Sequence, residues 1–385
     1  MFPVPYKRLA ILVFVSFAVF LPGYAQPRKN EASAFLPVQV DGKWGYINKS
    51  GIIVIEPQFD HAEPLTSGLG LVVTDAKIPY LGYINDSGQM GIKPRFWRTG
   101  IFAEGLAEVE SCGQYGFINT KGHVVIFPQF IGVGLFSEGL AAVRLSERTE
   151  GGQTGEPQWG FVDENGDVVI TPQFDYVSAF SEGLAKVGIG NDPDVKWGYI
   201  DKQGQFVIKP QFTLAGSFSE GLAAVEVGGR NENNVHKDGK YGYINKSGEF
   251  VIKPQFATAM RFSEGLAKVQ VGESSGNGDW GYIDKTGQIV IAAKLDYVSQ
   301  GERDCQTFSE GLACIVVGEK IGYIDRTGKI VIKPQYDVAG PFIDGIARVA
   351  IGKYANEGAG SHFVRIGDKW GYIDKLGKYI WQPSK

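Results

Sequence analysis

The amino-acid sequence predicts an all-β fold built from tandem three-stranded repeats. Its 385 residues include 53 glycines, 24 phenylalanines and 17 tyrosines, a composition typical of many short strands separated by turns. One stretch, which reads "KWGYIDKQG" at residues 196–204, recurs nine times in variant form. Such self-similarity is the signature of a repeat architecture, in which each unit buries its apolar face against its neighbours.

The first 25 residues have the pattern of a secretory signal peptide. Lys7 and Arg8 precede an apolar run at residues 9–21, and Ala25 ends a small-residue cleavage pattern. The thirteen apolar residues fall short of the roughly 20 that a membrane-spanning helix needs, which disfavours a permanent anchor. We therefore expect an exported protein, periplasmic or extracellular, with a signal peptide at 1–25, a linker at 26–35 and no membrane span after cleavage.

Charge and histidine content argue against two classes of ligand. Cleavage would remove Lys7 and Arg8 and change the formal net charge from −4 to −6. A mildly acidic chain with scattered charges lacks the basic surface that nucleic-acid binding requires. The four histidines are scattered without metal-ligand spacing, so we expect no metal and no cofactor.

The repeat domain spans residues 36–383. Each copy starts with an aromatic or aliphatic residue, followed by Gly, then Tyr or Phe, Ile or Val, and Asn or Asp, and a second Gly always stands seven residues after the start. The nine starts are Trp44, Leu81, Tyr115, Trp159, Trp197, Tyr241, Trp280, Ile321 and Trp370.

Within a copy, "WGYI", "DKQG" and "QFVIKPQF" predict a β-hairpin with a short loop. The Asn or Asp can accept hydrogen bonds from the backbone that follows it, and the closing Gly suits a left-handed turn position. A proline stands thirteen residues after the start in eight copies, with Ala293 in the other. We expect it to end the second strand because it has no N–H for the ladder. "SEGLA" then leads into a third strand such as "LAAVEV".

The insertions are confined to one connection of the repeat. From the start to the glycine of "EG" is 24 residues in seven of eight copies, and the exception has a seven-residue insertion around Cys305. From that glycine to the next start, the separation varies from 10 to 25 residues. We therefore expect the insertions to project from one edge of the array, which in repeat proteins is often the binding face.

The two ends of the repeat domain are complementary. The last copy stops at "IWQPSK" without a third strand, and "LPVQVD" at residues 36–41 resembles an orphan third strand. Either the N-terminal strand pairs with the last hairpin and closes a ring, or the array is an open solenoid. Nine units of three strands would be unusual for a propeller, so the sequence favours an open or superhelical β-array, with a closed propeller-like toroid as the alternative.

The copies "KWGYIDKQGQFVIKPQFTLAGSFSEGLAAVEV" and "KIGYIDRTGKIVIKPQYDVAGPFIDGIARV" resemble the bacterial WG-repeat family, also called KWG repeats. The resemblance covers residues 36–383. It implies a β-rich repeat domain in bacterial proteins that are often exported. It supplies no catalytic residues.

Few residues stand out as candidates for a site. The aromatic residues at the repeat starts are interpreted as core positions. Leu81 and Ile321 occupy the same repeat position, which a core site tolerates and a stacking site would not. The repeated "SEG" is interpreted as structural, since catalysis needs one unique constellation.

Trp97 between Arg95 and Arg98 has the composition of a partner-binding site. Cys305 and Cys314 are close enough in sequence for a disulfide, and the alternative is a pair of buried thiols.

These observations predict a non-catalytic scaffold. We expect the exported chain to mediate protein–protein interaction in the bacterial cell envelope or outside the cell, with an unidentified protein as partner. The alternative is a carbohydrate-binding module for an envelope glycan, suggested by the aromatic content. No unique polar pocket for catalysis can be identified, so an enzyme is not expected.

Overall fold

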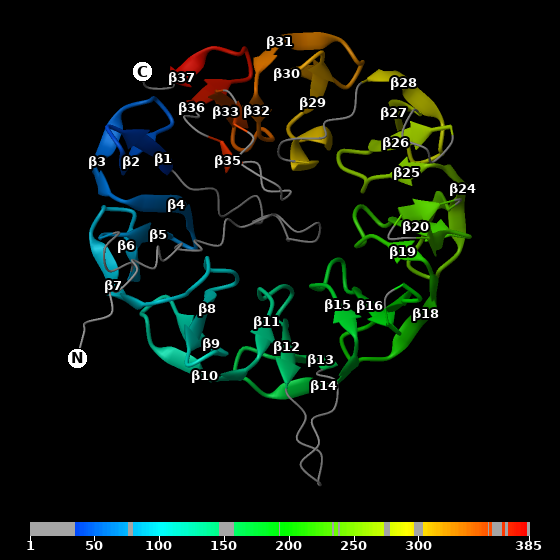
Figure 1. Cartoon of the computed structure of the whole chain (residues 1–385), viewed down its shortest axis with the longest axis horizontal. Helices are drawn as coiled ribbons and strands as arrows, with labels where there is room; N and C mark the ends of the chain where they lie inside the picture. Colours follow the sequence, from blue (N-terminus) through cyan, green and yellow to red (C-terminus); the bar gives the residue numbers. More distant parts are fainter. Residues whose placement is uncertain are drawn as a thin grey trace, which may run out of the picture.

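Nine small antiparallel sheets stand around a central axis and form a closed ring, a nine-bladed β-propeller (Figure 1). The computed structural model describes residues 35–75, 80–145, 158–191, 193–232, 235–237, 239–272, 278–295, 303–352, 354–355, 364–365 and 369–382. The open or superhelical array that the sequence favoured is therefore corrected to its alternative, the toroid. The predicted signal peptide, 1–25, and the linker up to residue 34 lie outside the described residues.

The blades are numbered along the chain, and their strands run from the axis outwards (Figure 1). Blade 1 contains β1 (Phe35–Val40), β2 (Lys43–Asn48) and β3 (Ile53–Phe59). Blade 2 contains β4 (His61–Thr66), β5 (Leu69–Val73), β6 (Leu81–Asn85) and β7 (Met90–Phe96). Blade 3 contains β8 (Leu106–Ser111), β9 (Gln114–Asn119) and β10 (Val124–Phe130). Blades 4 and 5 contain β11 (Gly132–Val133), β12 (Ala141–Leu145), β13 (Gln158–Val162) and β14 (Val168–Phe174); and β15 (Tyr176–Val177), β16 (Ala185–Ile189), β17 (Lys196–Ile200) and β18 (Phe206–Phe212).

Blades 6 and 7 contain β19 (Leu214–Ala215), β20 (Ala223–Val227), β23 (Lys240–Ile244) and β24 (Phe250–Phe256); and β25 (Thr258–Ala259), β26 (Ala267–Val271), β27 (Asp279–Ile283) and β28 (Ile289–Leu295). Blades 8 and 9 contain β29 (Leu312–Val317), β30 (Lys320–Asp325) and β31 (Ile330–Tyr336); and β32 (Val338–Ala339), β33 (Ile346–Ile351), β36 (Lys369–Asp374) and β37 (Tyr379–Trp381). A 3-10 turn, η1 (Arg303–Gln306), precedes β29, and two side hairpins pair β21 (Arg230–Glu232) with β22 (Val235–Lys237) and β34 (Tyr354–Ala355) with β35 (Val364–Arg365).

A full blade has four strands, which we call inner, second, WG and outer. The WG and outer strands come from one sequence repeat, and the second strand comes from the repeat before it. Six sheets are of this kind, so the prediction of three strands per unit missed the inner strand. Most of these inner strands have only two residues, such as Tyr176–Val177, too few for alternation to reveal them.

The proline of the outer strand lies inside the strand rather than at its end. In blade 5 the outer strand runs through Pro210, and the register shifts between the pairs Trp197–Phe212 and Tyr199–Ile208. The residues between these pairs form a bulge, one of the few places in a sheet where proline is tolerated. A Cβ on Gly198 would lie 2.6 Å from the nitrogen of Pro210, which explains the glycine of the WG step.

The hairpin loops follow the predicted turn chemistry. Asp201 Oδ1 accepts hydrogen bonds from the backbone N–H groups of Gln203 at 3.0 Å and Gln205 at 2.9 Å. Gly204 closes the loop with φ of 78°, and a Cβ there would lie 2.9 Å from Ile170 of the preceding blade. This glycine is therefore required both by the turn and by the packing between blades.

The hydrophobic core lies between the blades, and it continues across the junction of blade 9 with blade 1, which we call the seam. Val38 and Ile47 of blade 1 pack with Ile346 and Tyr372 of blade 9. Among the described residues, β1 pairs only with β2, so no sheet is shared between the two ends of the chain. The ring therefore closes through side chains, without the pairing of the N-terminal strand with the last hairpin that the sequence left open as one alternative.

Candidate functional site: the two faces of the ring

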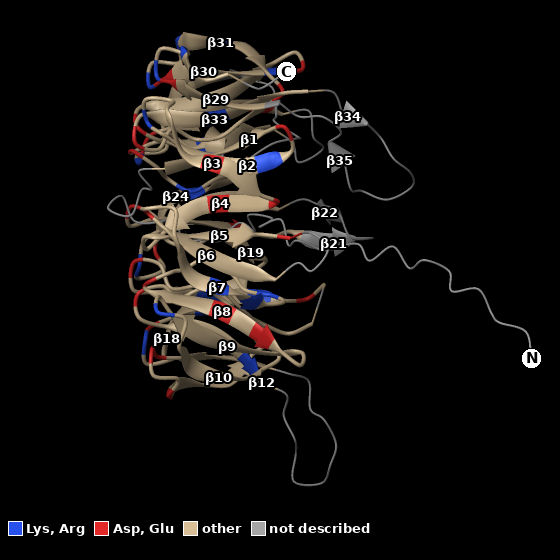
Figure 2. Cartoon of the chain, turned by 90° about the vertical axis from the view of Figure 1, so that its left-hand side faces the viewer, with Lys and Arg blue, Asp and Glu red and all other residues tan. Residues whose placement is uncertain are grey.

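The two kinds of connection lie on opposite faces because the strands within each blade are antiparallel. The hairpin loops of the WG motif and the "SEG" turns lie on one face, which we call the belt face. The variable connections, which contain β21–β22 and β34–β35, lie on the other, which we call the insertion face. In Figure 2 the belt face is the edge lined with alternating acidic and basic residues. For the two insertions whose side hairpins the structure describes, the prediction of a shared edge is confirmed.

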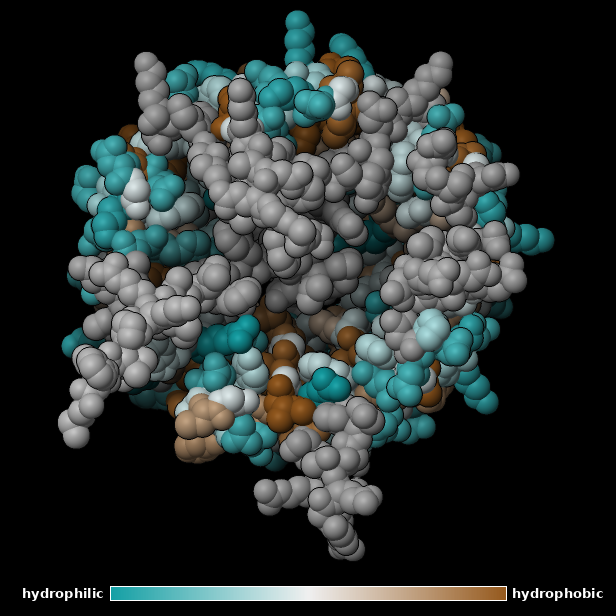
Figure 3. Space-filling model, viewed as in Figure 1, coloured by the Kyte–Doolittle hydropathy of each residue, from teal (hydrophilic) through white to brown (hydrophobic). Residues whose placement is uncertain are grey.

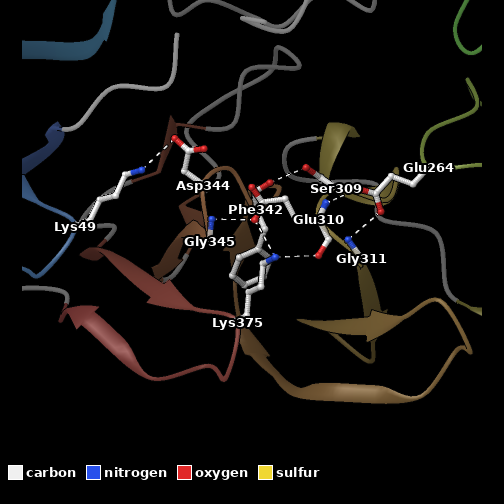
Figure 4. Close-up of polar contacts among 9 residues, drawn as sticks. All are labelled: Lys49, Glu264, Ser309, Glu310, Gly311, Phe342, Asp344, Gly345 and Lys375. Atoms are coloured by element: carbon white, nitrogen blue, oxygen red, sulfur yellow. Dashed lines mark hydrogen bonds and ion pairs between the residues drawn. The ribbon is translucent and has the colours of Figure 1, made fainter. Parts of the chain in front are cut away.

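The glutamates of the "SEG" turns join each blade to the next. Glu264 accepts hydrogen bonds from the N–H groups of Glu310 at 2.6 Å and Gly311 at 2.8 Å (Figure 4). The same contact to a turn glycine joins six consecutive pairs of blades: Glu104–Gly139, Glu138–Gly183, Glu182–Gly221, Glu220–Gly265, Glu264–Gly311 and Glu310–Gly345. Hydrogen bonds to a charged acceptor stabilise more than neutral ones, so this row ties blades 3 to 9 together.

The serines of these turns have the same role. Ser309 Oγ donates to the carbonyl oxygen of Phe342 in the next blade at 2.6 Å (Figure 4). Ser137, Ser181, Ser219 and Ser263 make the equivalent bond. The hydroxyl and carboxylate of the five complete "SEG" turns are thus engaged in structural contacts, as the sequence predicted.

Cations of the hairpin loops lie against the turn glutamates. Lys375 Nζ is 3.0 Å from Glu310 Oε2, and across the seam Lys49 Nζ is 3.1 Å from Asp344 Oδ2 (Figure 4). Lys202, Lys246, Lys285 and Arg326 make equivalent contacts. Blades 2, 3 and 4 have Asp86, Thr120 and Glu164 at this position. This loop position is therefore cationic in six neighbouring blades and not in the other three.

The tryptophans at the repeat starts lie between the blades, and each has a cation over its ring. The Lys186 ammonium is 4.4 Å from the centroid of Trp197, and Arg348 lies 3.9 Å from Trp370 and 6.0 Å from Trp44 across the seam. The other pairs are Arg144–Trp159 and Lys268–Trp280. In the blades that start with Leu, Tyr or Ile, the same second-strand positions hold Leu71 and Val73, Glu108 and Glu110, Ala224 and Glu226, and Cys314 and Val316. The cation thus stands on the blade's own second strand in four of the five tryptophan blades, whereas blade 1 has Pro37 and Gln39 there and receives Arg348 from blade 9.

A lysine is fully buried between blades 7 and 8. Lys268 Nζ donates to Gln306 Oε1 of η1 at 2.7 Å. Burial lowers the pKa of Lys268 to about 8, while the nearby Cys305 and Cys314 act in the opposite direction. Both cysteines are buried and no disulfide joins them, so the structure agrees with the alternative of buried thiols.

The three predicted partner-binding residues have different surroundings in the structure. Trp97 is 64 % exposed on the insertion face, with its ring 4.8 Å from that of Tyr80. Arg98 is also exposed, and its charge partly offsets the rise that burial causes in the pKa of Glu108. Arg95 instead donates from Nη2 to the carbonyl oxygen of Gly122 in the next blade, so it contributes to packing between blades. The sequence interpretation missed Tyr80, although it is an aromatic residue directly before a repeat start.

The insertion face also carries apolar side chains at the ends of the second strands. Ile189, Val271, Val317 and Ile351 are each more than a third exposed. In the space-filling view of this face, apolar side chains gather near β11 and β12 on the inner part of the ring (Figure 3). Such exposed apolar residues around a rim of variable connections are typical of an interaction surface.

Two further searches concern the described residues only. No three His, Cys, Asp or Glu side chains among them are grouped so as to hold a metal ion. None of the helices found there is long and apolar enough to cross a membrane.

Comparison with known proteins identifies the repeat and little else. No match is found among curated proteins. The β-propeller domain of the trilobed protease from Pyrococcus furiosus is 12% identical, with 79% of this chain and 95% of that chain covered and a TM-score of 0.39. Hsv2 from Kluyvelomyces marxianus is 10% identical, with 64% of this chain and 85% of that chain covered and a TM-score of 0.35. A puromycin-hydrolyzing peptidase from Mycobacterium tuberculosis is also 10% identical, with 94% of this chain and 56% of that chain covered and a TM-score of 0.39. These similarities are too low to inform function.

The family model of the WG containing repeat matches eight segments, residues 44–77, 82–111, 115–147, 159–191, 197–230, 241–273, 280–320 and 321–354. These segments make up more than half of the chain and correspond to the first eight predicted copies. The chain belongs to the WG-containing repeat family.

Proposed function

We propose that this propeller is an exported, non-catalytic scaffold that binds a protein partner through its insertion face. The difference between the two faces carries the proposal. On the belt face, the repeated polar groups are engaged in contacts between blades, such as Glu264 with Gly311. On the insertion face, Trp97 is largely exposed beside Tyr80. Large aromatic side chains next to arginine are enriched at the centre of protein interfaces.

Site-specific crosslinking tests this proposal. A photoreactive phenylalanine analogue at position 97 is expected to give one discrete crosslinked product in cells that express the protein naturally. The same analogue at position 127 is the control, because Phe127 is 75 % exposed on the outer strand of blade 3, away from the insertion face. Equal labelling from both positions, or no product from position 97 or its neighbours, would contradict the proposal.

Export is tested separately. If residues 1–25 are a signal peptide, intact-mass measurement of the protein from the cell envelope or medium should give a chain that begins at Gln26. A chain that keeps Met1 and stays with the cytoplasm would remove this part of the proposal.

Binding of an envelope glycan is the second candidate, favoured by partly exposed aromatic pairs on the same face. Besides Tyr80 with Trp97, Tyr176 is 39 % exposed, and its ring lies 5.8 Å from that of Trp197. Stacking of sugar rings on such faces would make the chain sediment with purified peptidoglycan, and Trp97→Ala and Tyr176→Ala should each reduce the bound fraction. Sedimentation that is absent, or unaffected by both substitutions, rejects this candidate.

A further inference from the structure

Arg348 of blade 9 is a cation without an anionic partner. Its guanidinium carbon lies 3.9 Å from the ring centroid of Trp370 and 6.0 Å from that of Trp44 in blade 1. It makes no hydrogen bond or ion pair with a described residue, and its Nε is buried without an acceptor. The two terminal Nη groups also lack acceptors, but they reach the surface. Stacking engages the face of the guanidinium, so the N–H groups at its edge remain free to bind an oxyanion.

The guanidinium reaches Trp44 because the sheet of blade 1 begins at its second strand. Among the described residues, β1 pairs only with β2, and no inner strand lies between β1 and the axis. Strand β1 contacts β36 of blade 9 and β4 of blade 2 (Figure 1). One cation therefore lies against the tryptophans of two consecutive blades, whereas Lys186 in blade 5 lies over a single ring, that of Trp197.

Strand β4 of blade 2 adds a histidine and a carboxylate. The His61 ring lies 5.5 Å from that of Trp44, edge to face, and His61 Nε2 is 2.8 Å from Glu63 Oε1. The two side chains are accessible, with 24% and 34% of their surface exposed. The equivalent positions of the other inner strands hold Gly132 and Gly134, Tyr176 and Ser178, Leu214 and Gly216, Thr258 and Met260, and Val338 and Gly340. We call Trp44, His61, Glu63, Arg348 and Trp370 the seam cluster.

The other charges of blades 1 and 2 beside the seam cluster do not neutralise its guanidinium. Lys43 Nζ is 2.5 Å from Asp60 Oδ1, and Glu63 is paired with His61. Asp41, at the tip of the β1–β2 turn, forms no ion pair with the guanidinium. A ligand carboxylate is the acceptor that fits the two Nη groups, because a guanidinium and a carboxylate can form two parallel hydrogen bonds.

The edge of β1 argues against a peptide as the rest of this ligand. An extended peptide binds a strand edge through the N–H and C=O groups of that edge. Pro37 has no N–H, and its carbonyl oxygen already accepts a hydrogen bond from Tyr372 at 2.9 Å. In blade 6 the equivalent carbonyl, that of Ala224, accepts instead from the N–H of Gly216 beside the inner strand at 2.8 Å. Aromatic surface with a few convergent polar groups suits a sugar ring better.

We propose that the seam cluster binds a sugar that bears a carboxylate. The carboxylate pairs with the Nη groups of Arg348, and the sugar ring packs against the exposed part of the Trp44 indole. Glu63 accepts a hydrogen bond from a sugar hydroxyl. The site goes beyond the proposed function, since it lies in other blades than Trp97 and Tyr176. Its failure would leave both candidate functions standing.

A glycan array tests the site. Oligosaccharides that contain hexuronic, sialic or muramic acid are printed beside their carboxyl-reduced forms, together with peptides that have a free C-terminal carboxylate. At least one acidic glycan is expected to bind the purified protein at least about tenfold more tightly than its reduced form. The proposal is overturned if no acidic glycan is preferred over its reduced form, or if the peptides bind and the glycans do not.

Variants assign the preference to the seam cluster. Arg348→Gln should make the acidic glycan and its reduced form bind alike. Lys186→Gln, which removes the cation over Trp197 in blade 5, is the matched control and should leave the preference unchanged. A preference that survives Arg348→Gln, or that Lys186→Gln also removes, overturns the assignment.

A second variant keeps the test decisive if Arg348→Gln lowers the thermal stability. Glu63→Met introduces the residue that blade 7 has at this position, Met260, and Glu63 is accessible enough for the fold to tolerate it. It should weaken the binding of both glycan forms, because both lose the acceptor for a hydroxyl. Unchanged binding of both forms by Glu63→Met would contradict the proposed site.

Discussion

The phenol of Tyr372 donates a hydrogen bond to the carbonyl oxygen of Pro37 at 2.9 Å, and this bond joins the last blade to the first. The equivalent tyrosines make the same bond inside the ring, for example Tyr199 to Gly216 at 2.7 Å. The seam thus repeats the contact that links every other described tyrosine of this position to its neighbouring blade. Among the described contacts, it differs from the junctions of blades 3 to 9 in lacking both the covalent connection and the hydrogen bond from a turn glutamate to a turn glycine.

Tyr372→Phe is expected to loosen the seam. The substitution leaves the Pro37 carbonyl without this donor, which costs about 1–2 kcal/mol in unfolding free energy. Hydrogen exchange in β1 and β2 should accelerate more than elsewhere, because the chain does not hold these blades together. Tyr199→Phe is the matched control, expected to lower the unfolding free energy without faster exchange at the seam. The same exchange pattern in both variants would show that the seam is no weaker than other junctions.

The closing glycine of the hairpin should tolerate alanine less well than the glycine of the "SEG" turn. Gly204 and Gly183 both have positive φ, 78° and 86°. A Cβ on Gly204 would lie 2.9 Å from Ile170, whereas one on Gly183 would meet nothing within 4 Å. Gly183→Ala should therefore cost only the conformational term, about 1 kcal/mol. Gly204→Ala should cost about 2–4 kcal/mol in denaturant unfolding, because packing strain adds to it. Equal losses of unfolding free energy in the two variants would mean that Ile170 of the neighbouring blade shifts to accommodate the added methyl group.

Lys186 and Trp197 should be energetically coupled. Trp197→Leu copies the residue that the chain has at Leu81, and Lys186→Met keeps most of the apolar stem. In a double-mutant cycle the two substitutions together should cost less than the sum of the single ones, with a coupling of about 0.5–2 kcal/mol. If the two losses of unfolding free energy add within error, the cation and the ring are not coupled, and the recurrence of cations beside tryptophan has another cause.

Lys268 should make stability depend on pH. Its pKa is lowered to about 8 in the fold, whereas an unfolded lysine titrates near about 10.4. Between these values the unfolded chain binds more protons, so the unfolding free energy rises with pH, by up to about 1.4 kcal/mol per pH unit. The check is chemical unfolding from pH 7 to 10, with Lys268→Met for comparison. Relative to this variant, the wild type should gain stability above pH 8, and parallel profiles would contradict the assignment.

The local structure was predictable because each position has a strict chemical requirement. Asp201 and Gly204 define the hairpin loop, and their spacing recurs in every copy, so the loop and its two strands follow from sequence. The proline was misinterpreted because the bulge at Pro210 depends on pairing with the WG strand, which the proline does not reveal by itself. The inner strands escaped detection because they are held by neighbouring strands rather than by a pattern of their own.

The closure of the ring could not be derived in the same way. It depends on how far each blade rotates relative to the next, and that angle is the sum of many contacts such as Glu220 with Gly265. Of the candidate residues, Trp97 is exposed as expected, and Arg95 also bonds to Gly122 of the next blade, a contact that depends on blade packing and that the sequence does not reveal. That these residues bind a partner stays a prediction. The pairing of cations with tryptophans was open to detection, since a comparison of Lys186 and Arg348 with the aligned residues of the other copies would have shown it.

The offset between sequence repeat and blade has a consequence for how this chain tolerates rearrangement. Each repeat supplies parts of two blades, and residues 35 and 382, the described ends, belong to adjacent blades (Figure 1). We therefore expect circular permutants, opened at any variable connection and joined across the seam by a short linker, to reform the same propeller. In such a permutant the seam would move to a new junction while the order of the blades around the ring stayed unchanged.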